Sequence, residues 1–147
     1  MLHNALCFFC DYKGLNMTLD ISAFAKALES LEEVLRLPLD PIIRDSTIQR
    51  FEYTYELAHK MLKRFLKMNA ANPHDIDALS FKELVRLAAV NGLINNPEDW
   101  FVYRKARNDT SHGYDENKAV LVYNQIQPFA QSATSLLIEL KKRINQV

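Results

Sequence analysis

The stretch AVLVYNQIQPFAQSATSLLIELKKRI, residues 119–144, decides the fold. Its apolar residues recur in alternating steps of four and three, which is the period of one buried helix face. That face carries Ala119, Tyr123, Ile126, Ala130, Ala133, Leu137, Leu140 and Ile144. Asp115 stands just before the stretch and is a good N-cap residue. A seam this long predicts a helix that packs inside a bundle.

Two more long helices are predicted in the first half of the chain. The first begins after Asp20, a good N-cap, and is stopped by the prolines at positions 38 and 41. The second begins near Ser46, because Ser46-x-x-Gln49 is typical of a capping box. Its apolar stripe runs through Ile48, Phe51, Tyr55, Ala58, Leu62 and Phe65.

Two shorter helices are predicted between the second and the last. Pro73 is placed in a loop, and Ser80-x-x-Glu83 is a second capping box that opens the next helix. Asn96-Pro97 combines a cap residue with proline at the first helical position, and this helix is expected to end near Gly113. The sequence therefore predicts an all-α, up-and-down bundle of four to five helices over residues 18–147. Residues 1–17 lack a clear period and are predicted to be a peripheral N-terminal extension.

Composition limits the classes of protein that this chain can be. Apolar residues make up 48% of the chain and charged residues 24%, as in ordinary globular domains. A net charge of zero argues against coating nucleic acid through bulk charge, although a local basic site stays open. No apolar run approaches the roughly 18 residues that a membrane-spanning helix needs. The lone pair Cys7 and Cys10 lacks the partners of a zinc site, so we expect reduced thiols, no metal or cofactor, and a cytoplasmic location.

One polar segment, Arg107 to Tyr114, carries the chemically suggestive residues. Trp100, Tyr103 and Arg107 share one helix face, so the arginine is either paired inside the bundle or aimed into a cleft. A histidine such as His112 can take the 2′-hydroxyl proton of RNA as a general base. A guanidinium can hold the charge that develops on the phosphate oxygens. This pair would support cleavage of RNA to a 2′,3′-cyclic phosphate without a metal.

The alternative is structural. Arg107 would pair with Glu52 or Glu56 on the second helix, and residues 108–112 would only cap and turn. The two side chains of Arg107 and His112 converge only if the helix breaks just before His112, or across a dimer axis. Spacing alone favours this structural alternative.

A resemblance changes that balance. Arg107-x4-His112-x-Tyr114 resembles the R-x4-H-x-Y signature of the HEPN superfamily, with the preferred polar residue Asn108 after the arginine. The most similar group is that of the HepT-like toxins, also known as nucleotidyltransferase substrate-binding proteins. Residues 48–58 resemble the second-helix signature of this family, and residues 98–100 resemble the lead-in to its active helix. The likeness covers about residues 18 to 145.

The resemblance implies a function and partners. Arg107 and His112 would be the catalytic pair of a metal-independent endoribonuclease toxin, with Asn108 and Asp109 shaping the site. Members act as homodimers that bring two motifs together over RNA. An MntA-like nucleotidyltransferase antitoxin would silence the toxin by transferring AMP to Tyr114, which adds bulk and negative charge beside the groups that receive phosphate.

The chain departs from the family pattern in the second helix, where His59 stands in place of the usual tryptophan before Lys60. We expect this change to affect packing and to add a titratable group near the groove. Lys60, Lys63, Arg64 and Lys67 have no acid close in sequence and are either an RNA-tracking patch or solvated ends of a helix.

Two further functions remain open from sequence. In the first of these, the bundle is a non-catalytic nucleotide- or substrate-binding subunit of a two-component nucleotidyltransferase, in which Arg107 holds a phosphate. A plain interaction bundle, in which the polar segment only caps a helix, is the third reading.

Overall fold

The computed structural model describes residues 18–111 and 115–145, and this part of the chain is helical without strands. Its helices are α2 (Ser22–Leu35), α3 (Pro41–Asn69), α4 (Pro73–Asp77), α5 (Phe81–Val90), α6 (Pro97–Asp109) and α7 (Glu116–Ile144). The predicted all-α bundle is confirmed. The predicted extension, residues 1–17, lies outside the described residues and stays a prediction.

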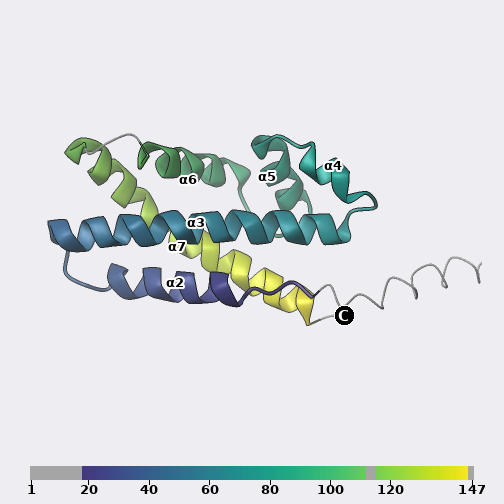
Figure 1. The fold of residues 1–147 in the computed structure, drawn as a ribbon, viewed down its shortest axis with the longest axis horizontal. Coiled ribbons are helices and arrows are strands. Elements are labelled where there is room, and N and C mark those ends of the chain that lie inside the picture. The colour runs from purple at the N-terminus through teal and green to yellow at the C-terminus, as the bar shows by residue number, and fades with distance from the viewer. Residues whose placement is uncertain (1–17, 112–114, 146–147) are drawn as a thin grey trace, which may run out of the picture.

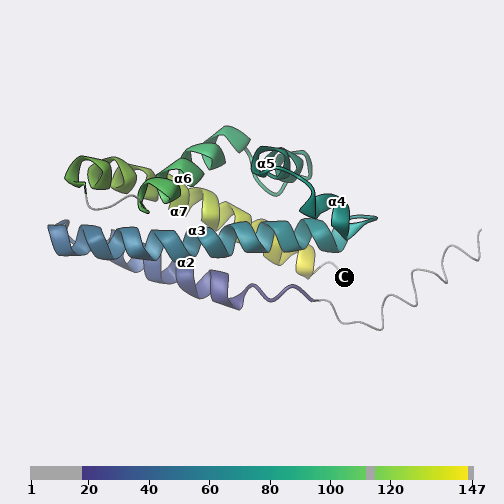
Figure 2. The same ribbon diagram turned by 45° about the horizontal axis from the view of Figure 1, so that its top comes forward.

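The long helix α3 forms the middle of the bundle. Helix α2 runs along one side of it, and α4, α5 and α6 lie on the other side (Figure 1). Helix α7 contacts α6, α3 and α2, so it crosses the bundle from the α6 side to the α2 side, as the turned view also shows (Figure 2). Because α3 and α7 both contact α6, they fix the position of the helix that carries Arg107.

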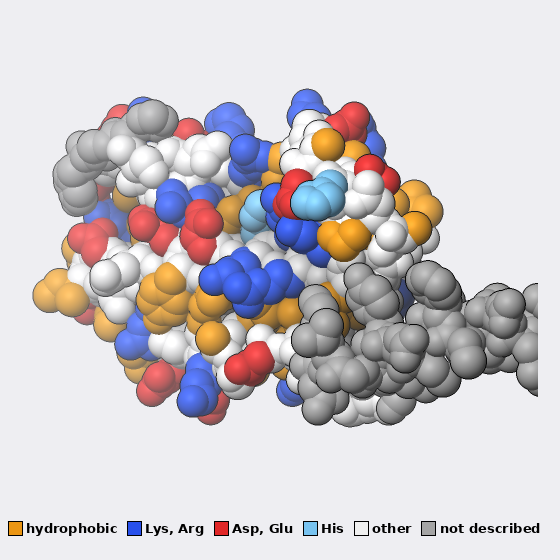
Figure 3. All heavy atoms as spheres, turned by 45° about the vertical axis from the view of Figure 1, so that its right-hand side comes forward, with side chains coloured by type: hydrophobic (Ala, Val, Ile, Leu, Met, Phe, Trp, Pro, Cys, Tyr) orange, Lys and Arg blue, Asp and Glu red, His pale blue; other side chains and the backbone are white. Residues whose placement is uncertain are grey.

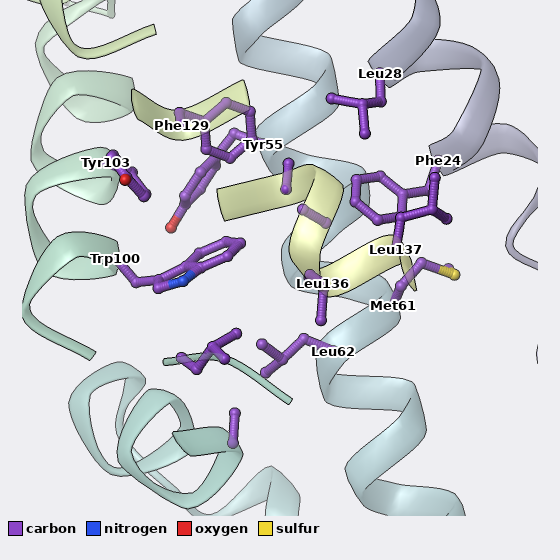
Figure 4. Packing of buried hydrophobic residues seen from close by; sticks show 14 of the residues in the cluster. Phe24, Leu28, Tyr55, Met61, Leu62, Trp100, Tyr103, Phe129, Leu136 and Leu137 are labelled. Carbon is purple, nitrogen blue, oxygen red and sulfur yellow. The ribbon is translucent and has the colours of Figure 1, made fainter. Parts of the chain in front are cut away.

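The core is centred on the ring of Phe129 from α7. Phe51 and Tyr55 of α3 lie with their ring centroids 5.1 and 6.1 Å from it, and Trp100 and Tyr103 of α6 lie at 6.0 and 5.4 Å. Trp100, Tyr103, Tyr55 and Phe129 point toward one another in the close view (Figure 4). Edge-to-face contacts of this kind add to the gain from burial. One ring of α7 therefore packs against both α3 and α6.

The start of α3 was predicted wrongly. The helix begins at Pro41 and not near Ser46, which is a residue inside it. Asp40 is the N-cap, and its carboxylate accepts a hydrogen bond of 2.7 Å from the backbone N–H of Ile43. Proline is unfavourable inside a helix, because it lacks the N–H of the backbone hydrogen bond, but its fixed φ and missing N–H suit the first helical position. Pro41 therefore starts α3, because the N–H that proline lacks would have no partner in the first turn of a helix.

A short helix stands where a loop was predicted. Residues 73–77 form α4, with Asn72 as N-cap and Pro73 in the first turn. Asp77 of α4 accepts ion pairs from Lys67 at 2.8 Å and from Lys63 at 3.3 Å. These hydrogen bonds from the two lysines lower the pKa of Asp77. Lys63 and Lys67, which have no acid close in sequence, thus find an acidic partner through the tertiary structure.

The other helix starts agree with the sequence. Ser80 and Glu83 form the predicted capping box of α5, and Asn96 and Asp115 cap α6 and α7. Helix α2 starts one residue later than an Asp20 cap implies, although the Asp20 carboxylate accepts the Ser22 N–H at 2.9 Å.

The end of α5 is held by the end of α7. Gly92 follows α5 with a φ of 74°, a conformation that favours glycine. Arg143, in the last turn of α7, donates a hydrogen bond of 2.6 Å to the carbonyl of Asn91. The C-terminal turn of the chain thus satisfies a backbone acceptor at the end of a helix more than fifty residues upstream.

Replacing Phe129 with alanine is expected to destabilise the protein by about 3–5 kcal/mol, because the ring is fully buried and its loss leaves a cavity among four aromatic side chains. Urea unfolding followed by circular dichroism measures the loss. Phe129→Leu is the matched variant and should cost clearly less. Equal unfolding midpoints for Phe129→Ala and the natural chain would contradict this central role.

Candidate functional site

The polar segment begins on the last turn of α6. Trp100, Tyr103 and Ala106 form the buried face of this helix, and Arg107 follows at the edge of that face with 24% of its side chain exposed. The guanidinium Nη1 donates a hydrogen bond of 3.0 Å to Oγ of Ser111. Thr110 Oγ1 donates one of 2.7 Å to the Arg107 carbonyl, which satisfies a backbone acceptor at the helix end. These contacts orient the arginine from within its own segment.

Arg107 also meets an acid of α3. Its Nε lies 3.1 Å from Oε1 of Glu56, one of the two partners expected under the structural alternative. The side chain of Glu56 is 56% exposed, so the pair lies at the surface and not in the interior. No acceptor among the described residues lies in line with the N–H of Arg107 Nε, although this atom is buried. Arg107 and Glu56 therefore form an ion pair without a well-aligned hydrogen bond at Nε.

The remaining predicted site residues divide into two sets. Asn108 and Asp109 lie on the last turn of α6, and both line an open hollow between α5 and α6. Asp109 lies 3.5 Å from Lys105, one helical turn earlier. His112 and Tyr114, as well as the predicted helix end at Gly113, fall outside the described residues. Helix α6 itself ends at Asp109.

A buried arginine that sequence reasoning missed lies at the start of α3. Arg44 is 7% exposed, and its Nη1 donates a hydrogen bond of 2.8 Å to Oε1 of Glu116 in the first turn of α7. This contact joins α3 to the residues that follow the polar segment. Its sequence signal was the helical spacing of positions 44, 47 and 51, which places Arg44 on the buried face of α3.

Two side chains of α3 lie close to the arginines of α6. Burial raises the pKa of the Tyr55 hydroxyl, which the charges of Arg104 and Arg107 oppose. His59 is half-buried and stacks parallel to Tyr55 at 6.4 Å, and it meets the ring of Phe81 at 5.6 Å. Burial lowers the pKa of His59, and the charges of Arg104 and Lys63 lower it further against the opposing charge of Glu56. The His59 ring thus packs between Tyr55 of α3 and Phe81 of α5, which agrees with the expected effect on packing.

A family model for proteins described as "Nucleotidyltransferase substrate binding protein like" matches residues 19–142. The chain belongs to this family. The match covers every helix of the described structure up to the last turn of α7, so the polar segment and the α3 residues that face it lie inside the family region.

Relatives of this chain include a protein of Haemophilus influenzae named "Probable ribonuclease HepT". It is 47% identical over 96 residues, which cover 65% of this chain and 66% of that protein. The matched segment thus spans just under two thirds of the relative.

Solved structures show the same fold. One, from Haemophilus influenzae, is described as the fold of a substrate-binding domain of a nucleotidyltransferase. It is 36% identical, has a TM-score of 0.77, and the match covers 83% of this chain and 99% of that one. A protein of Thermus thermophilus is 30% identical with a TM-score of 0.69, covering 80% and 98%. Within residues 18–111 and 115–145, no helix combines the length and apolar character that crossing a bilayer requires.

The stability of the protein is expected to depend on pH through His59. Since burial places the folded-state pKa of His59 below the ordinary histidine value of about 6.5, the unfolded chain binds the proton more readily. The free energy of unfolding should therefore fall as the pH drops below about 6.5 and approaches the folded-state pKa. Urea unfolding at pH 7.5 and 5.5 measures this change. His59→Phe, which keeps the ring packing, should show a smaller difference between the two pH values, and an identical difference would remove His59 as a cause.

Proposed function

We propose that this protein is a metal-independent endoribonuclease toxin of the HepT type, in which Arg107 and His112 act on one RNA phosphodiester. The observation that carries the proposal is the R-x4-H-x-Y motif combined with a partly exposed Arg107 guanidinium, which a hydrogen bond to Ser111 and a surface ion pair with Glu56 hold in place. The name of the Haemophilus influenzae relative supports the ribonuclease reading.

The chemistry follows from the two side chains. The neutral imidazole of His112 removes the proton of a ribose 2′-hydroxyl. The 2′-oxygen then attacks the adjacent phosphorus, the bond to the 5′-oxygen breaks, and that oxygen takes up a proton. The products are a 2′,3′-cyclic phosphate and a 5′-hydroxyl end. Arg107 stabilises the charge on the non-bridging oxygens in the transition state, with Asn108 and Asp109 shaping the pocket.

Two partners belong to this proposal. A second copy of the chain brings two motifs to one RNA strand, and a nucleotidyltransferase of the MntA type transfers AMP to Tyr114. The family description supports a nucleotidyltransferase partner. The added phosphate would repel RNA from the guanidinium of Arg107.

Arg107→Ala and His112→Ala are each expected to lower the RNA cleavage rate about 10²–10⁴-fold in EDTA, because each removes a group that acts in the transition state. Cleavage of a labelled RNA on a gel measures the rate. Arg107→Met is the matched variant that keeps the apolar stem, and a surface pair such as Arg107–Glu56 contributes about 1 kcal/mol or less, so the fold should persist. Full cleavage by both alanine variants would eliminate this pair as the catalytic machinery.

Incubation with the nucleotidyltransferase and ATP is expected to add the mass of AMP to the natural chain but not to Tyr114→Phe. Intact-mass spectrometry measures the addition, and cleavage before and after treatment measures silencing. Modification of Tyr114→Phe to the same extent would place the acceptor elsewhere.

The second candidate is a non-catalytic nucleotide- or substrate-binding subunit of a two-component nucleotidyltransferase. It is favoured by the family description and by the wording used for the solved Haemophilus influenzae structure. It predicts binding of a nucleotide or the partner without RNA cleavage, so the cleavage assay separates the two functions.

A further inference from the structure

Three cations surround two half-buried phenylalanine rings where α5 packs on α6. Phe81 and Phe101 meet edge to face with ring centroids 6.2 Å apart. The guanidinium of Arg104 lies 4.1 Å above the ring of Phe81. Lys82 and Arg86 lie 5.6 and 5.5 Å from the ring of Phe101. These five residues are called the α5–α6 cationic cluster.

The charge of this cluster is only partly offset by its neighbours, because Arg86 interacts electrostatically with Glu83 of the same helix. Within the described ranges, no carboxylate lies within 4 Å of the charged ends of Lys82, Arg86 or Arg104. Two acids lie close in sequence but have other partners. Glu83 accepts the Ser80 N–H at 2.7 Å, and Asp109 faces Lys105. Like charges held together cost free energy unless an anion joins them, so the cluster is suited to a polyanion.

The cluster opens onto a hollow that reaches the candidate catalytic segment. Phe81, Phe101 and Arg104 line it together with Lys105, Asn108 and Asp109. Asn108 is the direct neighbour of Arg107 in the chain. Arg104 and Arg107 are three residues apart on α6, so their side chains leave neighbouring positions on one face of this helix. A chain of phosphates bound at the cluster would therefore continue toward Arg107.

The chemistry of the cluster matches one nucleotide of a single strand. An arginine stacked on a ring presents its outer face to a base and keeps its N–H groups available for phosphate oxygens. Rings half exposed beside cations are the elements with which proteins hold single-stranded RNA. In the space-filling view of one face, blue Lys and Arg side chains lie in several places with red Asp and Glu side chains among them (Figure 3).

We propose that the α5–α6 cationic cluster is a binding subsite for a nucleotide of single-stranded RNA next to the bond that is cut. This inference rests on the proposed function, because it assigns a second contact for the same substrate. Arg86 and Arg104 hold phosphates, and the ring of Phe81 with the guanidinium above it supports a base.

The test compares Arg86→Gln/Arg104→Gln with the control Lys26→Gln/Arg36→Gln, whose two exposed cations lie on or next to α2, on the opposite side of α3. The probe is a short fluorescent RNA with 2′-O-methyl riboses, which lacks the nucleophile and so cannot be cut. Fluorescence anisotropy measures its affinity for the full chain over a range of salt concentrations. Thermal unfolding checks that both variants are folded.

The cluster variant is expected to bind this RNA at least about tenfold more weakly than the natural chain. The slope of log affinity against log salt should fall in magnitude by about 1.4, since each lost phosphate contact on a single strand removes about 0.7. The control variant should keep both the affinity and the slope. Lys82→Gln, which leaves the Arg104–Phe81 contact intact, is the second variant and should lose a smaller part of the affinity.

Each outcome decides between the two proposals. Unchanged affinity and slope in the cluster variant, or no binding of RNA by the natural chain, would overturn the subsite. If the cluster variant loses affinity while Arg107→Ala and His112→Ala still cut RNA, the subsite stands and the proposed catalytic pair fails. If the catalytic variants are inactive but the cluster variant binds normally, the proposed function stands without this subsite.

Discussion

The packing of Phe129 against aromatic rings from α3 and α6 is the constraint on which the candidate site depends. Tyr103 and Trp100 anchor α6 to this ring, and Tyr55 anchors α3. Because a helix is rigid over one turn, fixing Tyr103 also fixes Arg107 four residues later, and fixing Tyr55 fixes its neighbour Glu56. The distance of 3.1 Å between Arg107 and Glu56 is thus a consequence of core packing. The core places the charge, and the pair adds little to the stability of the core.

The sequence predicts those features that are encoded locally. The caps at Ser80, Asn96 and Asp115 lie within a few residues of the N–H groups that they accept, so their patterns name the helix starts directly. The error at α3 has a physical source, since Pro41 is compatible both with the end of one helix and with the start of the next. The position of a proline in the sequence does not separate these two roles. The nearby sequence Ser46-x-x-Gln49 also matches a capping box, although it lies inside α3.

Tertiary placement explains what sequence could not supply. The pairing of Arg107 with Glu56 is one of the two options that the structural alternative offered, and sequence alone did not choose between Glu52 and Glu56. The stacking of Arg104 on Phe81 and the burial of Arg44 against Glu116 depend on how helices cross, and no spacing within one helix encodes that. Likewise, Asp77 became the partner of Lys63 and Lys67 only because α4 folds back along α3. His112 and Tyr114 remain predictions from the motif.

The hydrogen bond from Arg143 to the carbonyl of Asn91 links the last turn of α7 to the end of α5. That carbonyl closes α5, the helix that presents Phe81 and Arg86, while the donor comes from the last turn of α7. Loss of the Arg143 side chain would leave this acceptor without its donor. The end of α5 is therefore coupled to a side chain that lies more than fifty residues later in the sequence.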